Sequence, residues 1–299
     1  MRTTRVAIVV LALVGVLPAR AANTPAALAP YEDLLEVLTT LTWHLDDDLY
    51  RFPIPKDPTG HDVFGLTLSR LVGWEQRFPG RMRDVTTFAR AQSLERARAY
   101  REAADGYREV AAMPTSELAA PAEVAARRTA AFADANALPE TGPSVQARLD
   151  ALSTKLDAWA ALTPQYPDQP YQALIRLEEE RLEVLAADEI TRNMHLIEDG
   201  PKTAEQALRF LVQKHAESKA LADHVLRLAD FYGARARRYA LENARPLEFD
   251  GAEFVQRVDL ALDTYQKIAT WDGSPARPVG RGCFEALEAF KDNELERHR

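Results

Sequence analysis

The chain has 299 residues, of which 27% are charged, and a formal net charge of −8 at pH 7. This acidic balance argues against a general nucleic-acid-binding protein, because contact with phosphates requires a basic surface. The single cysteine, Cys283, excludes an intramolecular disulfide, so packing must hold the fold together.

The first residues have the pattern of a secretory signal peptide. Arg2 and Arg5 precede an apolar run from Val6 to Leu17, and Ala19-Arg20-Ala21 has the form of an A-x-A cleavage site. The run is shorter than the ~20 apolar residues that cross a bilayer, and no later segment is apolar enough. We therefore expect a signal peptide over residues 1–21, cleavage near Ala21, a linker over 22–30, and an exported periplasmic or secreted protein without direct membrane insertion.

After the linker, apolar residues recur at helical spacing along most of the chain. A first helix begins near Pro30, and the segment RFPIPKDPTG, Arg51 to Gly60, is the clearest long loop. Further helices are expected near residues 63–74, as two helices within 85–112, and near 124–137, 145–162, 174–185, 204–213, 220–244, 254–270 and 284–290. No stretch shows the period-2 alternation of a strand, so we predict an all-α protein.

An aromatic-proline turn occurs twice between amphipathic helices. It is Phe78-Pro79-Gly80 in one place and YPDQPY, Tyr166 to Tyr171, in the other. A hairpin of two such helices cannot bury both apolar faces alone, so it must stack on a neighbouring hairpin. The turns therefore predict stacked antiparallel helix hairpins.

These helices resemble the tetratricopeptide repeat (TPR) family, whose consensus is W-x2-L-G-x2-Y on the first helix and A-x3-F on the second. In VLRLADFY, the first-helix spacing is matched by Val225, Leu228, Ala229 and Tyr232. The second-helix spacing is matched by Ala103, Tyr107 and Val110, by Ala204, Leu208 and Leu211, and by Ala261, Tyr265 and Ile268. The segment HAESKALADHVLRLADFY is similar to repeats of outer-membrane assembly lipoproteins and cell-division coordinator proteins. The chain is also similar to the large envelope repeat proteins of gliding bacteria.

The repeat spacing is irregular. Trp74 and Tyr107 are 33 residues apart, close to the family's ~34, but Tyr107 and Trp159 are 52 apart and Trp159 and Leu208 are 49 apart. We therefore expect an irregular α-solenoid of stacked antiparallel hairpins, a TPR-like superhelix. It would have an N-terminal lobe over residues 31–115 with one TPR-like unit and a lobe over 116–299 with degenerate units.

The sequence contains no recognised catalytic or metal-binding pattern. No pair of histidines has the H-E-x-x-H spacing, and Asp46 to Asp48 lack the alternation and the glycine of a calcium loop. Glu217-Ser218 matches the catalytic Glu-Ser of lytic transglycosylases, but the Gly-Leu-Met-Gln-like segment that follows it there is missing. Cys283 has no adjacent histidine, so we expect a buried thiol near Phe284. These patterns predict a protein that is not an enzyme and has no cofactor.

Two sets of side chains suit ligand binding. Arg235, Arg237 and Arg238 in GARARRY suit an acidic peptide terminus or an anionic glycan, and the alternative is a solvated helix end with Arg238 paired to Glu242. The four tryptophans suit sugar stacking, but their helical spacing favours packing. They are Trp43, Trp74, Trp159 and Trp271.

These patterns favour a non-enzymatic scaffold or adaptor of the bacterial cell envelope. It would bind an envelope protein or an extended peptide in a helical-repeat groove, because stacked hairpins form a long, rigid groove. One alternative is a peptidoglycan-associated factor or an accessory domain of a glycan-cleaving system. Another is the N-terminal part of a longer repeat protein, because the chain stops at FKDNELERHR without a clear polar cap.

Overall fold

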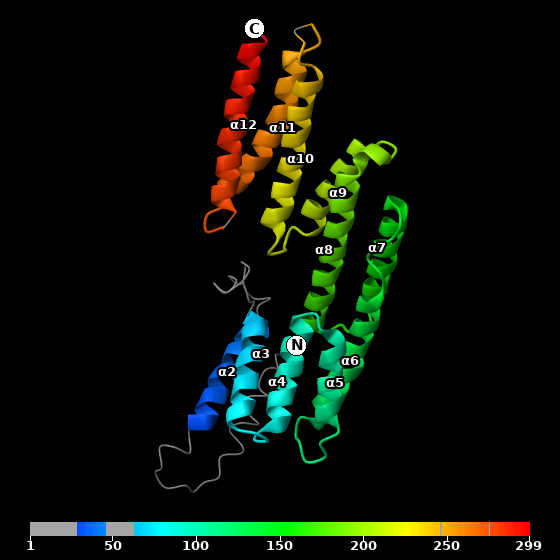
Figure 1. Ribbon diagram of the computed structural model, residues 1–299, viewed down its shortest axis with the longest axis vertical. Helices are drawn as coiled ribbons and strands as arrows, with labels where there is room; N and C mark the ends of the chain where they lie inside the picture. Colours follow the sequence, from blue (N-terminus) through cyan, green and yellow to red (C-terminus); the bar gives the residue numbers. More distant parts are fainter. Residues whose placement is uncertain (1–28, 46–62, 246, 275) are drawn as a thin grey trace. The chain divides into compact units, whose positions relative to one another are not determined.

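The computed structural model describes residues 29–45, 63–245, 247–274 and 276–299, which form helices joined by turns (Figure 1). No strand occurs in these ranges, so the all-α prediction is confirmed there. The helices are α2 (Ala29–Leu45), α3 (Val63–Arg77), α4 (Arg83–Arg96), α5 (Tyr100–Ala111), α6 (Ala119–Ala137), α7 (Val145–Ala160), α8 (Gln169–Arg192), η3 (Met194–Leu196), α9 (Gly200–Lys214), α10 (Leu221–Glu242), α11 (Gly251–Ala269) and α12 (Arg277–Arg297). The expected signal peptide, the loop over 51–60 and the three consecutive aspartates lie outside the described residues.

The helices occupy the positions that the apolar spacing predicts, with small differences at their ends. Of the expected linker over 22–30, Ala29 and Pro30 lie within α2, and the rest lies outside the described residues. The YPDQPY turn ends earlier than expected, because α8 begins at Gln169. A proline at the second position of a helix is compatible with this start, since the first-turn N–H groups have no partner within the helix.

The turn between α4 and α5 depends on an arginine in the left-handed conformation. Arg98 has a φ of 65°, and its N–H bonds to the carbonyl of Glu95, while the N–H of Ala99 bonds to the carbonyl of Leu94. This pattern is a Schellman motif, which usually carries glycine at the left-handed position. Arg98 is held there by its guanidinium, which bonds to the buried carboxylate of Glu178 on α8.

We predict that Arg98→Ala destabilises the protein more than Arg98→Gly, by about 1 kcal/mol, although both variants lose the bond to Glu178. Glycine adopts the left-handed conformation without strain, whereas alanine does not. Urea unfolding of the two variants measures the difference, with Arg101→Ala at an exposed position of α5 as the control. Equal stability of the two variants would contradict this account of the turn.

The described residues divide into two compact units. The first contains residues 29–45, 63–140 and 154–179, and the second contains residues 141–153 and the described residues from 180 to 299. This division differs from the expected lobes over 31–115 and 116–299, since α6 packs along α5 and is grouped with the first unit. Alanines make this close packing of α5 and α6 possible, and Ala103, Ala122, Ala125 and Ala126 are all buried.

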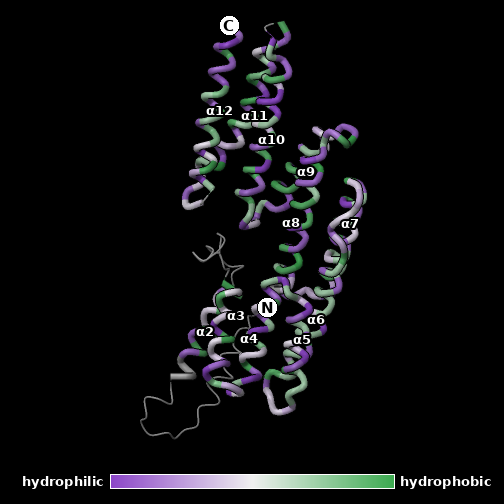
Figure 2. Tube along the Cα trace, viewed as in Figure 1, coloured by the Kyte–Doolittle hydropathy of each residue, from purple (hydrophilic) through white to green (hydrophobic). Residues whose placement is uncertain are grey.

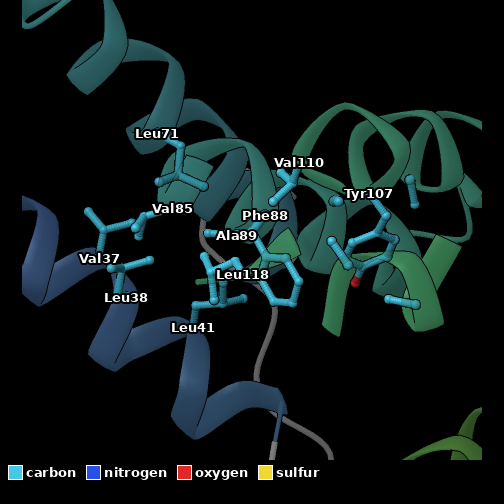
Figure 3. Packing of buried hydrophobic residues seen from close by; sticks show 14 of the residues in the cluster. Val37, Leu38, Leu41, Leu71, Val85, Phe88, Ala89, Tyr107, Val110 and Leu118 are labelled. Atoms are coloured by element: carbon cyan, nitrogen blue, oxygen red, sulfur yellow. The ribbon is translucent and has the colours of Figure 1, made fainter. Parts of the chain in front are cut away.

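The core of the first unit is formed by the stripes of α2 to α6 that face one another (Figure 3). Leu38 and Leu41 of α2 and Leu71 of α3 are at most 3% exposed. Gly106 of α5 lies so close to α4 that an added Cβ would be 3.2 Å from the Cβ of Ala91. The unit is therefore built by consecutive helices that each cover a neighbour.

Aromatic residues of the two turns pack into this unit. Phe78 lies against Trp74 with ring centroids 5.3 Å apart, and Tyr166 meets Phe132 of α6 edge-on at 5.6 Å. Tyr171 lies under the guanidinium of Arg128 at 3.7 Å. The turns thus contribute packing as well as helix ends.

The tryptophans divide between core and surface. Trp74 and Trp159 are almost completely buried, as the spacing predicts, and Trp271 is partly buried. Trp43 is 66% exposed, so the packing prediction is wrong for this residue. Its position on α2 lies off the stripe that faces α3 and α4, because that stripe continues from Leu41 to the partly buried Leu45.

The core of the second unit lies between α9, α10, α11 and α12, which pack consecutively. Figure 2 shows the alternation of hydrophobic and hydrophilic residues along these helices that gives each one an apolar side. Helix α11 lies between α10 and α12, and its Phe254, Val258, Ala261 and Ile268 have no exposed surface. Asp250 caps α11, since its carboxylate accepts bonds from the N–H groups of Ala252 and Glu253.

We predict that Leu228→Asp costs several kcal/mol of unfolding free energy. Leu228 is 9% exposed in the core of the second unit, so the variant loses ~2 kcal/mol of apolar burial and adds a buried charge. Thermal unfolding measures the loss. The matched control is Leu241→Asp on the same helix, where the side chain is 79% exposed and the change should stay within ~0.5 kcal/mol. Unchanged melting of Leu228→Asp would contradict the packing of this unit.

Candidate functional site

The three arginines proposed from the sequence lie on α10 and have different partners. Arg238 donates to Glu242 at 2.6 Å across one helical turn, as the solvated alternative predicts. The guanidinium of Arg235 lies 5.8 Å from the ring of Phe231, and that of Arg237 lies 6.0 Å from the ring of Phe290 on α12. Among the described residues, Arg235 and Arg237 form no ion pair.

These arginines share the exposed side of α10. Ala234, Arg237, Arg238 and Leu241 are exposed and recur at intervals of three or four residues, so they lie on one face of the helix. Arg235 is partly buried at the edge of this face. The side chains of Arg237 and Arg238 are exposed on this face, and guanidinium groups bind carboxylates with two parallel hydrogen bonds.

A hydrogen-bonded cluster adjoins this face. The hydroxyl of Tyr265 donates to Asp230 at 2.5 Å, and burial together with this bond raises the pKa of Tyr265 well above its usual range. Burial and the carboxylate of Asp230 also raise the pKa of Cys283. The thiolate is the nucleophilic form of cysteine, so the cluster disfavours a reactive Cys283. The thiol is half-buried, which makes the expectation of a buried thiol too strong.

A second cluster, which sequence reasoning missed, joins α8 to α9 and α10. Glu180 accepts from Nε2 of His224 at 2.5 Å, and Glu183 accepts from Nε2 of His215 at 2.6 Å and from Lys214. The two imidazole rings are 5.7 Å apart, and all four acid and imidazole side chains are at most 10% exposed. Only the spacing of the two glutamates on one face of α8 signals this cluster in the sequence.

The arrangement of this cluster suits helix attachment better than catalysis. In a catalytic triad the serine hydroxyl bonds to the imidazole of the histidine. Here Ser218 bonds instead to Glu180, the carboxylate that also bonds to His224. Within the described ranges, no group of three or more His, Cys, Asp or Glu residues is arranged to hold a metal ion. Glu180 instead connects α8 to α10 through His224. Glu183 connects α8 to Lys214 of α9 and to His215, which follows α9 directly.

We predict that Glu180→Gln makes stability less sensitive to acid. The pKa of Glu180 is lowered from about 4.5, because the bonds from His224 and Ser218 outweigh burial, which acts in the opposite direction. A lowered pKa stabilises the folded state above the unfolded value, and this contribution is lost as pH falls through the folded value. Below about pH 4.5 the wild type should therefore lose stability more steeply than Glu180→Gln in urea unfolding.

The control for this prediction is Glu217→Gln, which changes an exposed carboxyl of the neighbouring turn. Its acid dependence should follow that of the wild type. A steep loss of stability in Glu180→Gln over the same pH range would show that other groups control acid unfolding.

The buried polar network of the first unit is bonded internally, around the carboxylate of Glu95. Glu95 accepts from Arg128 at 2.9 and 3.1 Å, from Thr129 at 2.8 Å and from Tyr107 at 3.1 Å. All four side chains are at most 5% exposed, and Tyr171 covers the guanidinium. Removing one partner of such a buried pair typically costs ~3–5 kcal/mol, so the network is a structural element of α4, α5 and α6.

Two shallow depressions lie on the first unit. One, of about 360 Å³, lies between α5 and α6, and the other, of about 510 Å³, lies between α2 and α3. Their arginines already form ion pairs, Arg108 with Asp105, Arg127 with Glu123, and Arg77 with Asp33. These depressions lack the convergent polar groups of a small-molecule site.

The residues proposed as the repeat core are all buried, with exposures from 0 to 9%. Ala103, Tyr107 and Val110 lie in the core of the first unit. The other residues lie in the second unit, and they are Ala204, Leu208, Leu211, Val225, Leu228, Ala229, Tyr232, Ala261, Tyr265 and Ile268. Because these side chains are buried, their role is in packing. A partner can contact only the exposed positions of the same helices.

No protein-family model and no curated protein matches the chain. In the part of the chain that the structure describes, no helix has the length and apolar character needed to span a membrane.

Proposed function

We propose that the chain is a non-enzymatic scaffold or adaptor of the bacterial cell envelope, which binds a partner protein or peptide on a helical-repeat surface. The observation that carries this proposal is the exposed face of α10, where Arg235 and Arg237 form no ion pair among the described residues. Export is supported by the sequence of residues 1–21. The adjoining Cys283 and the two Glu–His pairs are arranged for packing, and this supports binding over catalysis.

For the architecture we propose an irregular, TPR-like α-solenoid. In such repeats the first helix of each hairpin contacts the first helix of the next. Contacts between alternate helices support this, since His224 and Arg227 of α10 bond to Glu180 and Asp188 of α8. Arg237 of α10 likewise lies against Phe290 of α12.

The test is crosslinking of the tagged protein in the cell that makes it, with an Arg235→Glu, Arg238→Glu double variant alongside. We predict that melting of the variant is nearly unchanged, because both side chains are at least partly exposed, while a discrete partner protein is captured less. Arg209→Glu, on a partly exposed arginine of α9, is the control and should capture the partner normally.

Two outcomes would contradict the proposed function. Recovery of peptidoglycan alone would favour the glycan-associated alternative, and a parallel pulldown on purified sacculus separates it from a protein partner. Recovery of nothing from wild-type protein would remove the basis for a scaffold.

A further inference from the structure

Helix α12 has one uncharged stripe among its otherwise mostly charged exposed positions. The stripe recurs at intervals of three and four residues, so it lies along one face of the helix. It consists of Val279, Gly282, Cys283, Ala286, Phe290 and Asn293. Val279 is 53% exposed, Gly282, Ala286 and Asn293 are also exposed, and Cys283 and Phe290 are half-buried. Elsewhere on α12, exposed positions carry mainly arginine, glutamate and aspartate.

This stripe borders the exposed side of α10. Arg237 lies over Phe290, and Cys283 interacts with Tyr265, whose hydroxyl binds Asp230. Between these two levels, a Cβ added to Gly233 would lie 3.9 Å from Leu287. Helices α10 and α12 therefore run in the same direction, and the α10–α12 face consists of Asp230, Ala234, Arg237 and Arg238 together with the α12 stripe.

We infer that the α10–α12 face binds an acidic segment of a partner protein that carries a bulky apolar side chain. This inference rests on the proposed scaffold function and adds the chemistry of the partner. The stripe supplies an apolar surface with small residues at Gly282 and Ala286, so a large side chain can lie on it without displacing helix residues. Arg237 supplies a guanidinium that lies 6.0 Å from the ring centre of Phe290 and forms no ion pair among the described residues, so its N–H donors can bind a carboxylate.

Charge explains why the segment is acidic. A basic or neutral segment would cover Arg237 without supplying a counter-charge, and burying an uncompensated charge is unfavourable. The protein as a whole has a net charge of −8, whereas this face carries Arg237 and Arg238 against Asp230, with Arg238 paired to Glu242. Long-range repulsion disfavours acidic partners elsewhere, and Arg237 determines where on this face such a partner binds.

The experiment is selection of a randomised peptide library on the purified protein, followed by fluorescence anisotropy of the selected peptides. We expect acidic peptides with a large apolar residue, and binding that weakens as salt rises, because exposed ion pairs are screened. Cys283 is the only cysteine, so its alkylation rate reports occupancy of the face, and a bound peptide should slow it.

Two pairs of variants locate the binding. Ala286→Glu and Ala289→Glu change exposed alanines of the same helix, but only Ala286 is on the stripe. Arg237→Glu and Arg281→Glu each reverse the charge of an exposed arginine. Only Arg237 is on the face, whereas Arg281 lies off the stripe and pairs with Glu285. We expect at least ~10-fold weaker binding for Ala286→Glu and Arg237→Glu, and a change below ~2-fold for the two controls.

Several results would overturn the inference. They are selection of basic or uncharged peptides, no selection at all, equal binding by Ala286→Glu, or dimerisation of the protein through this face without peptide binding. Capture of the partner in cells by Ala286→Glu and Arg237→Glu at the wild-type level would move the site elsewhere and leave the scaffold function standing. If wild-type protein captures no partner, the proposed function fails as well.

Discussion

The fold depends on apolar stripes that only a neighbouring helix can cover. Cys283 is the single cysteine, so no intramolecular disulfide contributes and each helix must be held by its neighbours. Helix α11 is the clearest case, because α10 and α12 both pack against it and Phe254 and Val258 have no exposed surface. Complete burial of a side chain of this size stabilises the fold by ~1.5–3 kcal/mol. Consecutive packing of this kind leaves α10 and α12 with one side each for other contacts.

Buried carboxylates also connect neighbouring helices, in addition to this apolar packing. Glu95, Glu178, Glu180 and Glu183 are nearly buried, and each accepts hydrogen bonds from basic side chains. A buried ion pair is weak evidence for net stability, because desolvation offsets the attraction. We interpret these carboxylates as groups that select the correct neighbour, since an alternative helix pairing would leave a charge buried without its partner.

The same packing explains the position of the candidate site. Tyr265 of α11 binds Asp230, and Phe290 supports Arg237, so residues from three helices determine which groups of the α10–α12 face stay accessible. Rigid helices hold that face without a ligand, which reduces the ordering that binding requires. A scaffold function suits this arrangement because the surface is formed before a partner arrives.

Helix positions were predictable from the sequence because local apolar spacing determines which side of each helix is buried. The buried state of residues such as Tyr107, Leu208 and Ile268, and the Arg238–Glu242 pair, follow from the same local periodicity. Tertiary structure decided the division between the units, the left-handed Arg98, the Glu–His cluster and the uncharged stripe beside Arg237. These features join residues that are far apart in the chain, and their contacts depend on which helices pack together, which helical spacing does not encode.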